Sequence, residues 1–373
     1  MVTVLKHPGV AQLGLTTGQR IARVHADLRM GAPIVIRESG TAHLVAAVET
    51  AVPDVISQFR AVARDGIIHV AVTARRARTL AARAYDGDLA RLIVPAEADT
   101  GWIRSIADPS RDLETPMKGP FMSLRGGSPA VARAAIRQCK QSRLLPAAVI
   151  SPVPEHVPIP AELTSLSCEL LCHDENRTLR LHEVARGNVP LKVSPRSRVH
   201  VFRPSDGGEE HYAIEIGDPD RDAPVLTRLH SACFTGDLLG SLKCDCGHQL
   251  RAALGEMGEP GAGVLLYLNQ EGRGIGLANK LRAYTLQDQG YDTVDANHRL
   301  GFEDDERDFR LGAEMLQLLG FGSVRLMTNN PAKVDFMRRN GIAVEERVPL
   351  VVERTRLNAD YLDTKARRSG HLL

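Results

Sequence analysis

Three cysteines crowd into one short stretch of this chain, and they restrict its fold more than any other feature. Cys233, Cys244 and Cys246 lie in the run HSACFTGDLLGSLKCDCG, in which glycines mark turns. Thiolates this close together in a reducing compartment typically hold a soft divalent metal, and zinc is the usual one. The backbone must therefore turn so that the three sulfurs can meet.

The number of thiolates indicates the kind of metal site. A structural zinc is held by four protein ligands, whereas a catalytic zinc keeps one position open for water. Three cysteines therefore predict a metal that activates water. His248 is an alternative fourth ligand, but it starts a predicted helix and we expect it to point elsewhere. Three small buried side chains are the other alternative; the polar, glycine-terminated turn at Cys244–Gly247 disfavours it.

Composition indicates a globular protein without a polyanionic or membrane partner. The 373 residues are 43% hydrophobic and 25% charged, with a formal net charge of +2. No apolar run approaches the roughly 18 residues that span a bilayer, and the N-terminus shows no secretory signal. Six cysteines are few for a disulfide scaffold, so we expect a cytoplasmic protein. Cys139, Cys168 and Cys172 occupy helical positions and are expected to pack in a core.

The chain is predicted to be an α/β (α+β) protein of two domains. Residues 1–160 alternate strands and helices, including paired strands at 33–38 and 43–49 around the turn Ser39-Gly40. The segment SPVPEHVPIP (151–160) holds four prolines, which predicts a stiff, extended boundary. Residues 175–373 begin with period-two strands and continue with alternating helices and strands, which predicts a second domain.

Two segments of the second domain are suited to bind an anion. Gln270–Gly276 (QEGRGIG) follows an apolar strand and precedes a helix, so its glycines let backbone N–H groups approach a phosphate while Arg273 adds charge. TNNPAK (328–333) places Asn330 as a helix cap and Pro331 in the first turn. Neither loop matches a P-loop or a Rossmann fingerprint, and a plain strand-to-helix turn is the alternative for each.

The charged run Asp304–Asp308 reads by itself as a solvated surface loop. Considered together with the cysteines and the two anion-binding segments, it suggests metal-assisted hydrolysis of a phosphorylated substrate.

A set of long motifs resembles the GTP cyclohydrolase II family. In chain order they are RLHSACFTGDLLGSLKCDCGHQL, LNQEGRGIGLANKLRAYTLQDQGYDTVDAN, LGFEDDERDF, LMTNNPAKV, ERVPL and YLDTKARRSGHLL, covering about residues 185–373. The resemblance implies hydrolysis of GTP to 2,5-diamino-6-ribosylamino-pyrimidinone 5′-phosphate, formate and diphosphate, at the first step of riboflavin synthesis. It also implies one zinc ion per subunit, Mg²⁺ with the triphosphate, and a homodimer.

The resemblance assigns roles to residues at matching motif positions. Cys233, Cys244 and Cys246 match the zinc ligands. Asp305 resembles the proton acceptor, Arg307 the nucleophile that takes the guanylyl group, and Tyr284 a tyrosine near the reacting ring. Contacts to the nucleotide are implied for Arg228, His230, Gln249, Glu271, Arg273, Thr293, Thr328 and Lys333.

The chain departs from the family pattern at Ala232, where glutamate is usual. Alanine cannot accept a hydrogen bond, so one contact to the nucleotide or to its surroundings is lost. Two alternatives therefore stay open: a homologue with an altered substrate or pathway, and a regulatory protein that binds zinc and nucleotide without turnover. A zinc-ribbon nucleic-acid binder is disfavoured because no second C-x₂-C pair is present.

The first half faintly resembles 3,4-dihydroxy-2-butanone 4-phosphate synthase, through GAPIVI, VAVTARRARTL and CKQSRLLPAAVI. That synthase needs a dense acidic loop for magnesium after its first strand, and here the stretch Arg37–Thr41 offers one carboxylate. We expect a degenerate, non-catalytic domain kept for folding, dimerisation or regulation.

Overall fold

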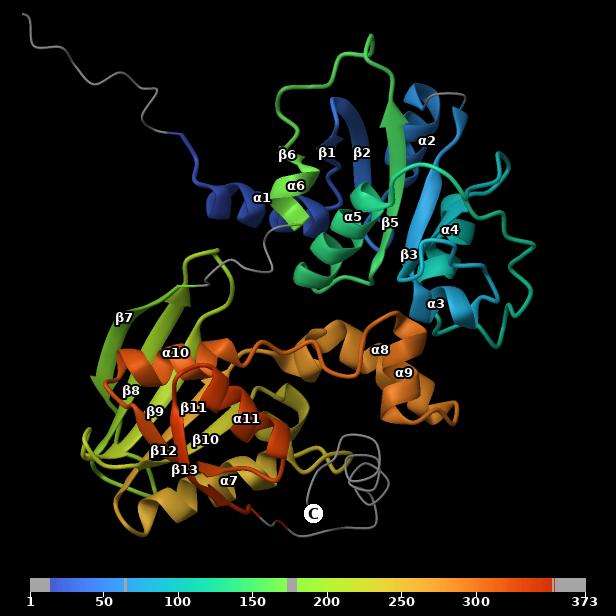
Figure 1. Ribbon diagram of the computed structural model, residues 1–373. Coiled ribbons are helices and arrows are strands. Elements are labelled where there is room, and N and C mark those ends of the chain that lie inside the picture. Colours follow the sequence, from blue (N-terminus) through green and yellow to red (C-terminus); the bar gives the residue numbers. More distant parts are fainter. Residues whose placement is uncertain (1–13, 64–65, 173–179, 351, 353–373) are drawn as a thin grey trace, which may run out of the picture.

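The computed structural model describes residues 14–63, 66–172, 180–350 and 352, which form two sheets with helices on both faces of each (Figure 1). The expected mixed α/β fold class is confirmed, with one sheet in each half of the chain. The C-terminal motif YLDTKARRSGHLL lies outside the described residues. Within the described residues, no helix combines the length and the apolar character needed to cross a bilayer.

The first half builds a six-stranded sheet in the order β4-β3-β5-β2-β1-β6. Its strands are β1 (Ile34–Glu38), β2 (Thr41–Ala47), β3 (His69–Thr73), β4 (Leu89–Ile93), β5 (Ala147–Val153) and β6 (Ser165–Ser167). The predicted hairpin at Ser39-Gly40 is present, because β1 and β2 pair antiparallel from Glu38 with Thr41. The sheet takes in β6, which pairs parallel with β1, so this unit extends past the proline-rich segment.

Helices cover both faces of the first sheet. On one face α1 (Thr17–Met30), α5 (Ala130–Gln141) and α6 (Cys168–Cys172) bury apolar residues against the strands. Cys139 and Cys168 lie in this core and Cys172 packs against it, as expected from their helical spacing. The other face carries α2 (Pro53–Val62), α3 (Ala74–Thr79) and α4 (Thr100–Ala107).

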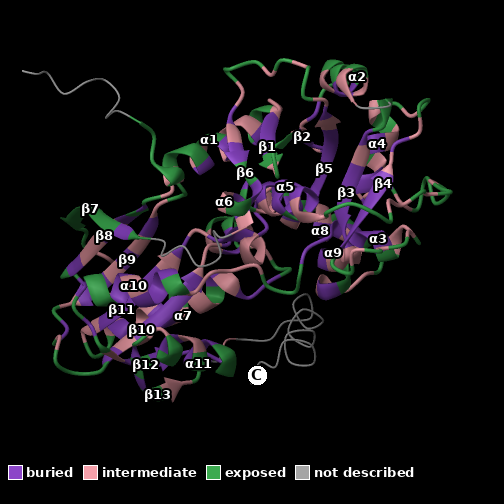
Figure 2. Ribbon diagram, turned by 45° about the horizontal axis from the view of Figure 1, so that its top comes forward, coloured by how far each residue is buried: buried purple, intermediate pink, exposed green. Residues whose placement is uncertain are grey.

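The second half builds a seven-stranded sheet in the order β13-β12-β10-β11-β9-β8-β7. Its strands are β7 (Leu181–Asn188), β8 (Ser197–Pro204), β9 (His211–Gly217), β10 (Val225–Ser231), β11 (Ala262–Leu268), β12 (Ser323–Met327) and β13 (Ala343–Val348). Helices α10 (Arg310–Leu318) and α11 (Pro331–Arg339) pack on one face, and α7 (Cys246–Gly258) packs on the other. In Figure 2 the central strands of both sheets are buried between their helices.

Two helices of the second half belong to the core of the first. Helices α8 (Leu277–Asp288) and α9 (Thr293–Leu300) lie between the two sheets in Figure 1. Their apolar side chains Ala283, Leu286, Ala296 and Leu300 join one buried cluster with Val70, Leu92 and Ile103 of the first unit. The two halves therefore share one buried apolar cluster.

This shared core predicts that the two halves unfold together. Replacing Leu286, which is 1% exposed, by alanine removes apolar contacts between α8 and the first sheet. We expect Leu286→Ala to lower the free energy of unfolding by about 2–5 kcal/mol, measured by chemical denaturation. Leu281→Ala on the same helix is the matched control, because Leu281 is 48% exposed. Equal stability of the two variants would contradict the shared core.

Candidate functional site

Three parallel strands bring the motif-bearing loops to one edge of the second sheet. Strand β10 pairs parallel with β11 on one side and with β12 on the other. The cysteine segment follows β10, the glycine-rich loop follows β11, and the Thr328–Lys333 segment follows β12. Because the carboxyl ends of parallel strands meet at the same edge, segments far apart in sequence line one cavity of about 590 Å³.

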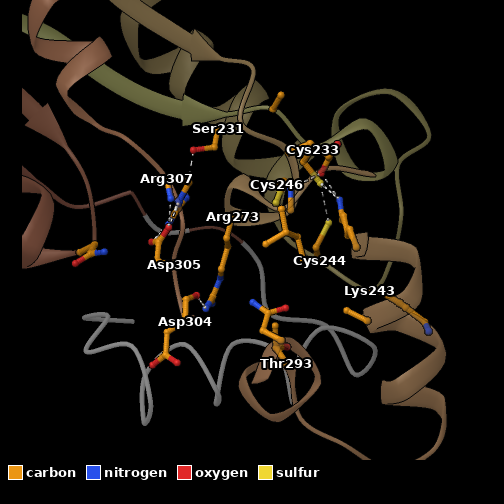
Figure 3. Close-up of a pocket in the computed structure, with 18 of the residues that line it drawn as sticks. Ser231, Cys233, Lys243, Cys244, Cys246, Arg273, Thr293, Asp304, Asp305 and Arg307 are labelled. Atoms are coloured by element: carbon orange, nitrogen blue, oxygen red, sulfur yellow. Dashed lines mark hydrogen bonds and ion pairs between the residues drawn. The ribbon is translucent and has the colours of Figure 1, made fainter. Parts of the chain in front are cut away.

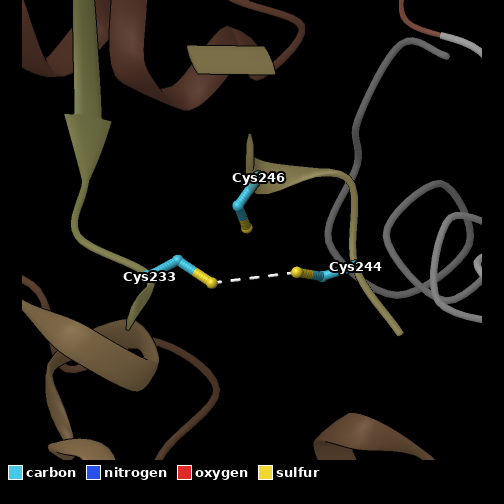
Figure 4. A group of neighbouring side chains, drawn as sticks. All are labelled: Cys233, Cys244 and Cys246. Carbon is cyan, nitrogen blue, oxygen red and sulfur yellow. Dashed lines mark hydrogen bonds between the residues drawn. The ribbon is translucent and has the colours of Figure 1, made fainter. Parts of the chain in front are cut away.

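The three cysteines meet at one end of this cavity, and within the described residues they are the one group suited to hold a metal ion. Their sulfurs lie within 4.8 Å of one another, and those of Cys233 and Cys244 are 3.7 Å apart (Figure 4). A tetrahedral zinc with bonds of about 2.3 Å separates its sulfur ligands by about 3.8 Å, so the cluster fits this metal. His248 is exposed on α7 and stands outside the cluster.

Glycine is needed beside the sulfurs for steric reasons. A Cβ at Gly236 would lie 2.8 Å from the Sγ of Cys244 and 3.0 Å from the Sγ of Cys233. The peptide at this position therefore forms part of the wall that closes around the thiols. Hydrogen bonds from the Cys244 and Cys246 thiols, together with the nearby Lys280 ammonium, hold the pKa of Cys233 well below its usual range.

Asp237 fixes the start of the cysteine loop. Its buried carboxylate accepts hydrogen bonds from the Cys233 backbone N–H (3.0 Å) and the Tyr267 hydroxyl (2.9 Å), and it pairs with His230 Nε2 at 3.0 Å. The His230 and Tyr267 rings stack with centroids 5.5 Å apart. Burial lowers the pKa of His230, so its imidazole is neutral at pH 7. His230 therefore orients the cysteine loop through Asp237 while it lines the cavity.

Lys280 links the cysteines to the glycine-rich loop. Its Nζ donates to the Sγ of Cys233 at 3.0 Å and to Oε1 of Glu271 at 2.8 Å. Burial alone would lower the pKa of Lys280, but these two partners outweigh burial and raise it. Glu271 is 9% exposed and also accepts from the Phe234 N–H at 2.6 Å. Tyr284 stands one helical turn after Lys280, and burial raises the pKa of its hydroxyl.

The glycine-rich loop turns through two consecutive residues with left-handed backbone angles. Gly272 and Arg273 both have left-handed backbone angles, with φ of 64° and 61°. A Cβ at Gly274 would lie 2.7 Å from the carbonyl carbon of Glu306, so the loop and the charged run touch through backbone. Arg273 Nη1 donates to the Asp304 carbonyl at 3.1 Å. This contact places the Arg273 side chain beside the Asp305–Arg307 pair (Figure 3).

Asp305 and Arg307 form an ion pair at the opposite wall from the cysteines (Figure 3). Arg307 Nε and Nη2 reach the two carboxylate oxygens of Asp305 at 2.8 and 2.5 Å, and Nη1 donates to Ser231 Oγ at 3.2 Å. Burial alone would raise the pKa of Asp305, but the hydrogen-bonded guanidinium of Arg307 outweighs burial and lowers it. Asp305 is therefore ionised at neutral pH.

The floor of the cavity holds a buried arginine. Arg228 is 7% exposed, donates to the Met327 carbonyl at 3.1 Å and to the side-chain oxygen of Gln249, and burial lowers its pKa to about 10. Gln249 donates in turn to Asp245. The Nε of Arg228 has no hydrogen-bond partner. A buried arginine whose Nε–H lacks an acceptor can donate a hydrogen bond to an anionic or carbonyl-bearing ligand.

The fourteen residues to which the resemblance assigns a role all line this one cavity. Besides those described above, Thr293 accepts from Gln287 Nε2 at 2.9 Å, and Lys333 Nζ donates to the Leu229 carbonyl at 3.2 Å. Thr328 Oγ1 accepts from the Asn330 N–H at 3.1 Å, and Asn330 caps α11 as expected.

Sequence reasoning missed three residues that organise the site. Asp237, Lys280 and Ser231 each contact a predicted site residue directly. The spacing of four between Lys280 and Tyr284 places both on one helix face and could have indicated Lys280. Nothing in the sequence pattern distinguishes Asp237 from a turn residue. Ala232 lines the cavity, and its N–H donates to the Leu268 carbonyl at 2.8 Å.

Comparison with known proteins identifies relatives of this chain. Residues 182–349 match the family described as GTP cyclohydrolase II. A GTP cyclohydrolase-2 from Azospirillum brasilense is 43% identical, over 94% of this chain and 93% of that protein. A GTP cyclohydrolase-2 from Escherichia fergusonii is 61% identical, over 52% of this chain and 98% of that protein. The solved structure of a two-domain 3,4-dihydroxy-2-butanone 4-phosphate synthase from A. baumannii has a TM-score of 0.31 and 15% identity, over 90% of this chain and 100% of that chain.

The geometry of the cysteine cluster predicts one zinc ion per chain. Serine in place of Cys233, Cys244 or Cys246 removes a thiolate, so we expect bound zinc to fall well below stoichiometry in each variant, measured by elemental analysis. Cys172→Ser is the control, because Cys172 packs against the first core, remote from the cavity. Wild-type protein that folds and holds no zinc would refute the assignment.

Proposed function

This chain belongs to the GTP cyclohydrolase II family of riboflavin-synthesis enzymes, and we propose that its cavity opens the imidazole ring of GTP and releases formate and diphosphate. The observation that carries the proposal is the meeting of three thiols and the Asp305–Arg307 pair at opposite walls of one cavity. Such a cavity can hold the purine beside the metal site and the triphosphate beside the arginine. The remaining product is the diaminopyrimidinone nucleoside 5′-phosphate.

Cys233, Cys244 and Cys246 would hold the zinc ion that activates water toward the purine. Zinc bound by the three cysteines would lower the pKa of a water ligand toward about 7, which provides a nucleophile at neutral pH. Lys280 and Asp237 hold Cys233 from both sides, through its sulfur and its backbone N–H. These contacts orient the site before substrate arrives. We assign to Tyr284, which lines the same cavity as the cysteines, the contact with the reacting ring.

Residues at the strand ends hold the nucleotide. We assign the recognition of guanosine to Arg228, Gln249 and Glu271, whose side chains are buried or half-buried and carry hydrogen-bonding groups into the cavity. Arg273 and Lys333 offset the charge of the triphosphate, together with the Thr328 hydroxyl at the start of α11. His230 and Thr293 complete the walls. Mg²⁺ is proposed to accompany the triphosphate, and the enzyme is proposed to act in the cytoplasm as a homodimer.

The Asp305–Arg307 pair acts at the α-phosphate. Asp305 is ionised, so it can accept a proton from Arg307 or hold its guanidinium in the attacking geometry. Attack of Arg307 on the α-phosphorus transfers the guanylyl group as diphosphate leaves, and water later releases the nucleotide. Ser231 Oγ accepts a hydrogen bond from Arg307 Nη1 at 3.2 Å, which helps to orient the guanidinium. The two chemical steps thus use opposite walls of the cavity.

A direct assay tests the proposed function. Purified protein incubated with GTP and Mg²⁺ is expected to release formate and the pyrimidine product, and Cys244→Ser is expected to abolish formate release because the water-activating metal is lost. Cys172→Ser should retain wild-type turnover. Stoichiometric zinc without any turnover would instead favour a regulatory protein, and turnover of another nucleotide alone would favour an altered substrate.

The pKa of Asp305 predicts a specific pH dependence. Because its pKa lies below the ordinary value of 3.8, Asp305 is ionised throughout the range from about pH 5 to about pH 8. Asp305→Asn is therefore expected to lower kcat by about 10²-fold, by the same factor across this range. Asp335→Asn, which changes an exposed carboxylate of α11 outside the cavity, is the control. A defect that vanishes at the acid end of the range would show that Asp305 titrates there, contrary to this assignment.

A further inference from the structure

The segment that carries Asp305 and Arg307 lies between the two halves of the chain. We call residues 301–308 the acidic loop. Its own half holds it through backbone: the Glu306 N–H donates to the Arg273 carbonyl at 2.9 Å, and Gln270 Nε2 donates to the Asp308 carbonyl at 2.8 Å. Residues 303–308 of this loop are exposed or half-buried, so they need further anchors if Arg307 is to keep one position.

Lys140 of the first half supplies one anchor. This residue lies near the end of α5, and its Nζ contacts Oε1 of Glu306 at 2.5 Å. The same oxygen accepts from the Glu303 N–H at 2.9 Å, so one carboxylate closes the acidic loop and ties it to α5. The two side chains are 22% and 23% exposed. This pair is therefore less screened by solvent than an ordinary surface ion pair.

The start of the acidic loop also packs against the first half of the chain. Thr73 Oγ1 donates to the Gly301 carbonyl at 2.9 Å within a buried contact. A Cβ at Gly301 would lie 2.8 Å from Pro146 Cγ, so the two halves approach closely here. Arg75 Nη2 pairs with Glu303 at 2.9 Å, and Phe302 is 1% exposed in the shared core.

Arg143, just after α5, holds the glycine-rich loop from the same side. Its Nη2 donates to the Asn269 carbonyl at 2.9 Å, and its own carbonyl accepts from Asn279 Nδ2 at 3.0 Å. A Cβ at Gly276 would lie 3.0 Å from the Arg143 Cβ. The C-terminal end of α5 therefore reaches both loops that carry proposed active-site residues.

From these contacts we propose that Lys140 and Arg143, here called the α5 clamp, are positioning residues for the reaction. The proposal rests on the proposed function of Asp305, Arg307 and Arg273. Neither member of the clamp lines the cavity, and neither does Glu306, so the clamp acts through the loops it holds. The first half of the chain is then a working part of the active site, although it contributes no group to the chemistry. Misplacing a reacting group by about 1 Å can cost about 10²-fold in rate.

The test compares variants of one helix in the full-length protein. Lys140→Met removes the charge and keeps the length of the side chain, and it is expected to lower kcat about tenfold, with KM for GTP changed less than about twofold. Lys140→Arg should restore most of kcat, because it keeps a cation within reach of Glu306. Arg143→Met is expected to lower kcat in the same way through the glycine-rich loop. Zinc content should match wild type in all three.

Arg133→Met is the matched control. Arg133 lies on α5 and pairs with Asp88 inside the first half at 2.7 Å, so the same change there should leave kcat unaltered. Amide hydrogen exchange of a peptide spanning 301–308 should be faster in Lys140→Met than in Arg133→Met. Wild-type kcat and exchange in Lys140→Met, or equal losses in both variants, would overturn the proposal. Inactive wild-type protein would refute the proposed function instead, and the exchange comparison would still decide whether the clamp holds the loop.

Discussion

The parallel pairing of β10 with both β11 and β12 is the constraint on which the site depends. The register is continuous from Thr227 with Val264 to Ser231 with Leu268, so β10 and β11 end at the same level. Each following segment leaves the sheet at that edge and must turn at once. Glycine permits these turns at two places. At Gly236 a side chain would collide with the cysteine sulfurs, and at Gly272 it would strain the left-handed backbone. The convergence of cysteines, Arg273 and Lys333 follows from this geometry.

Ion pairs within the cavity walls hold the charged side chains of the site in place. Lys280 lies between Glu271 and Cys233, and Arg307 pairs with Asp305, so these three groups each contact a cation before ligand binds. Burial raises the cost of leaving any of these charges unpaired. The cavity is therefore preorganised, and a polyanionic ligand would have to compete for Arg307 and Lys280 or find donors already free, such as Arg228 Nε.

Sequence reasoning recovered those features that depend on local pattern. The β1–β2 turn, the Asn330 cap of α11 and the packing of Cys139 and Cys168 follow from spacing and turn chemistry within a few residues. The packing of α9 against the first sheet has no such local signal, because the apolar residues of this short helix face strands from a distant part of the chain. The role of Asp237 likewise depends on Tyr267 thirty positions away. Long-range packing of this kind leaves no periodic signal.

The shared core bears on why the first half is present at all. Relatives of about half this length match 52% of this chain with nearly their whole sequence, so the family does not need every element described above. In this chain, however, Leu286, Leu300 and Phe302 are buried against the first sheet. Exposing such side chains would cost about 25 cal/mol for each Å² of apolar surface. Removing the first half would therefore expose the apolar faces of the helices that carry Tyr284 and Thr293 to solvent.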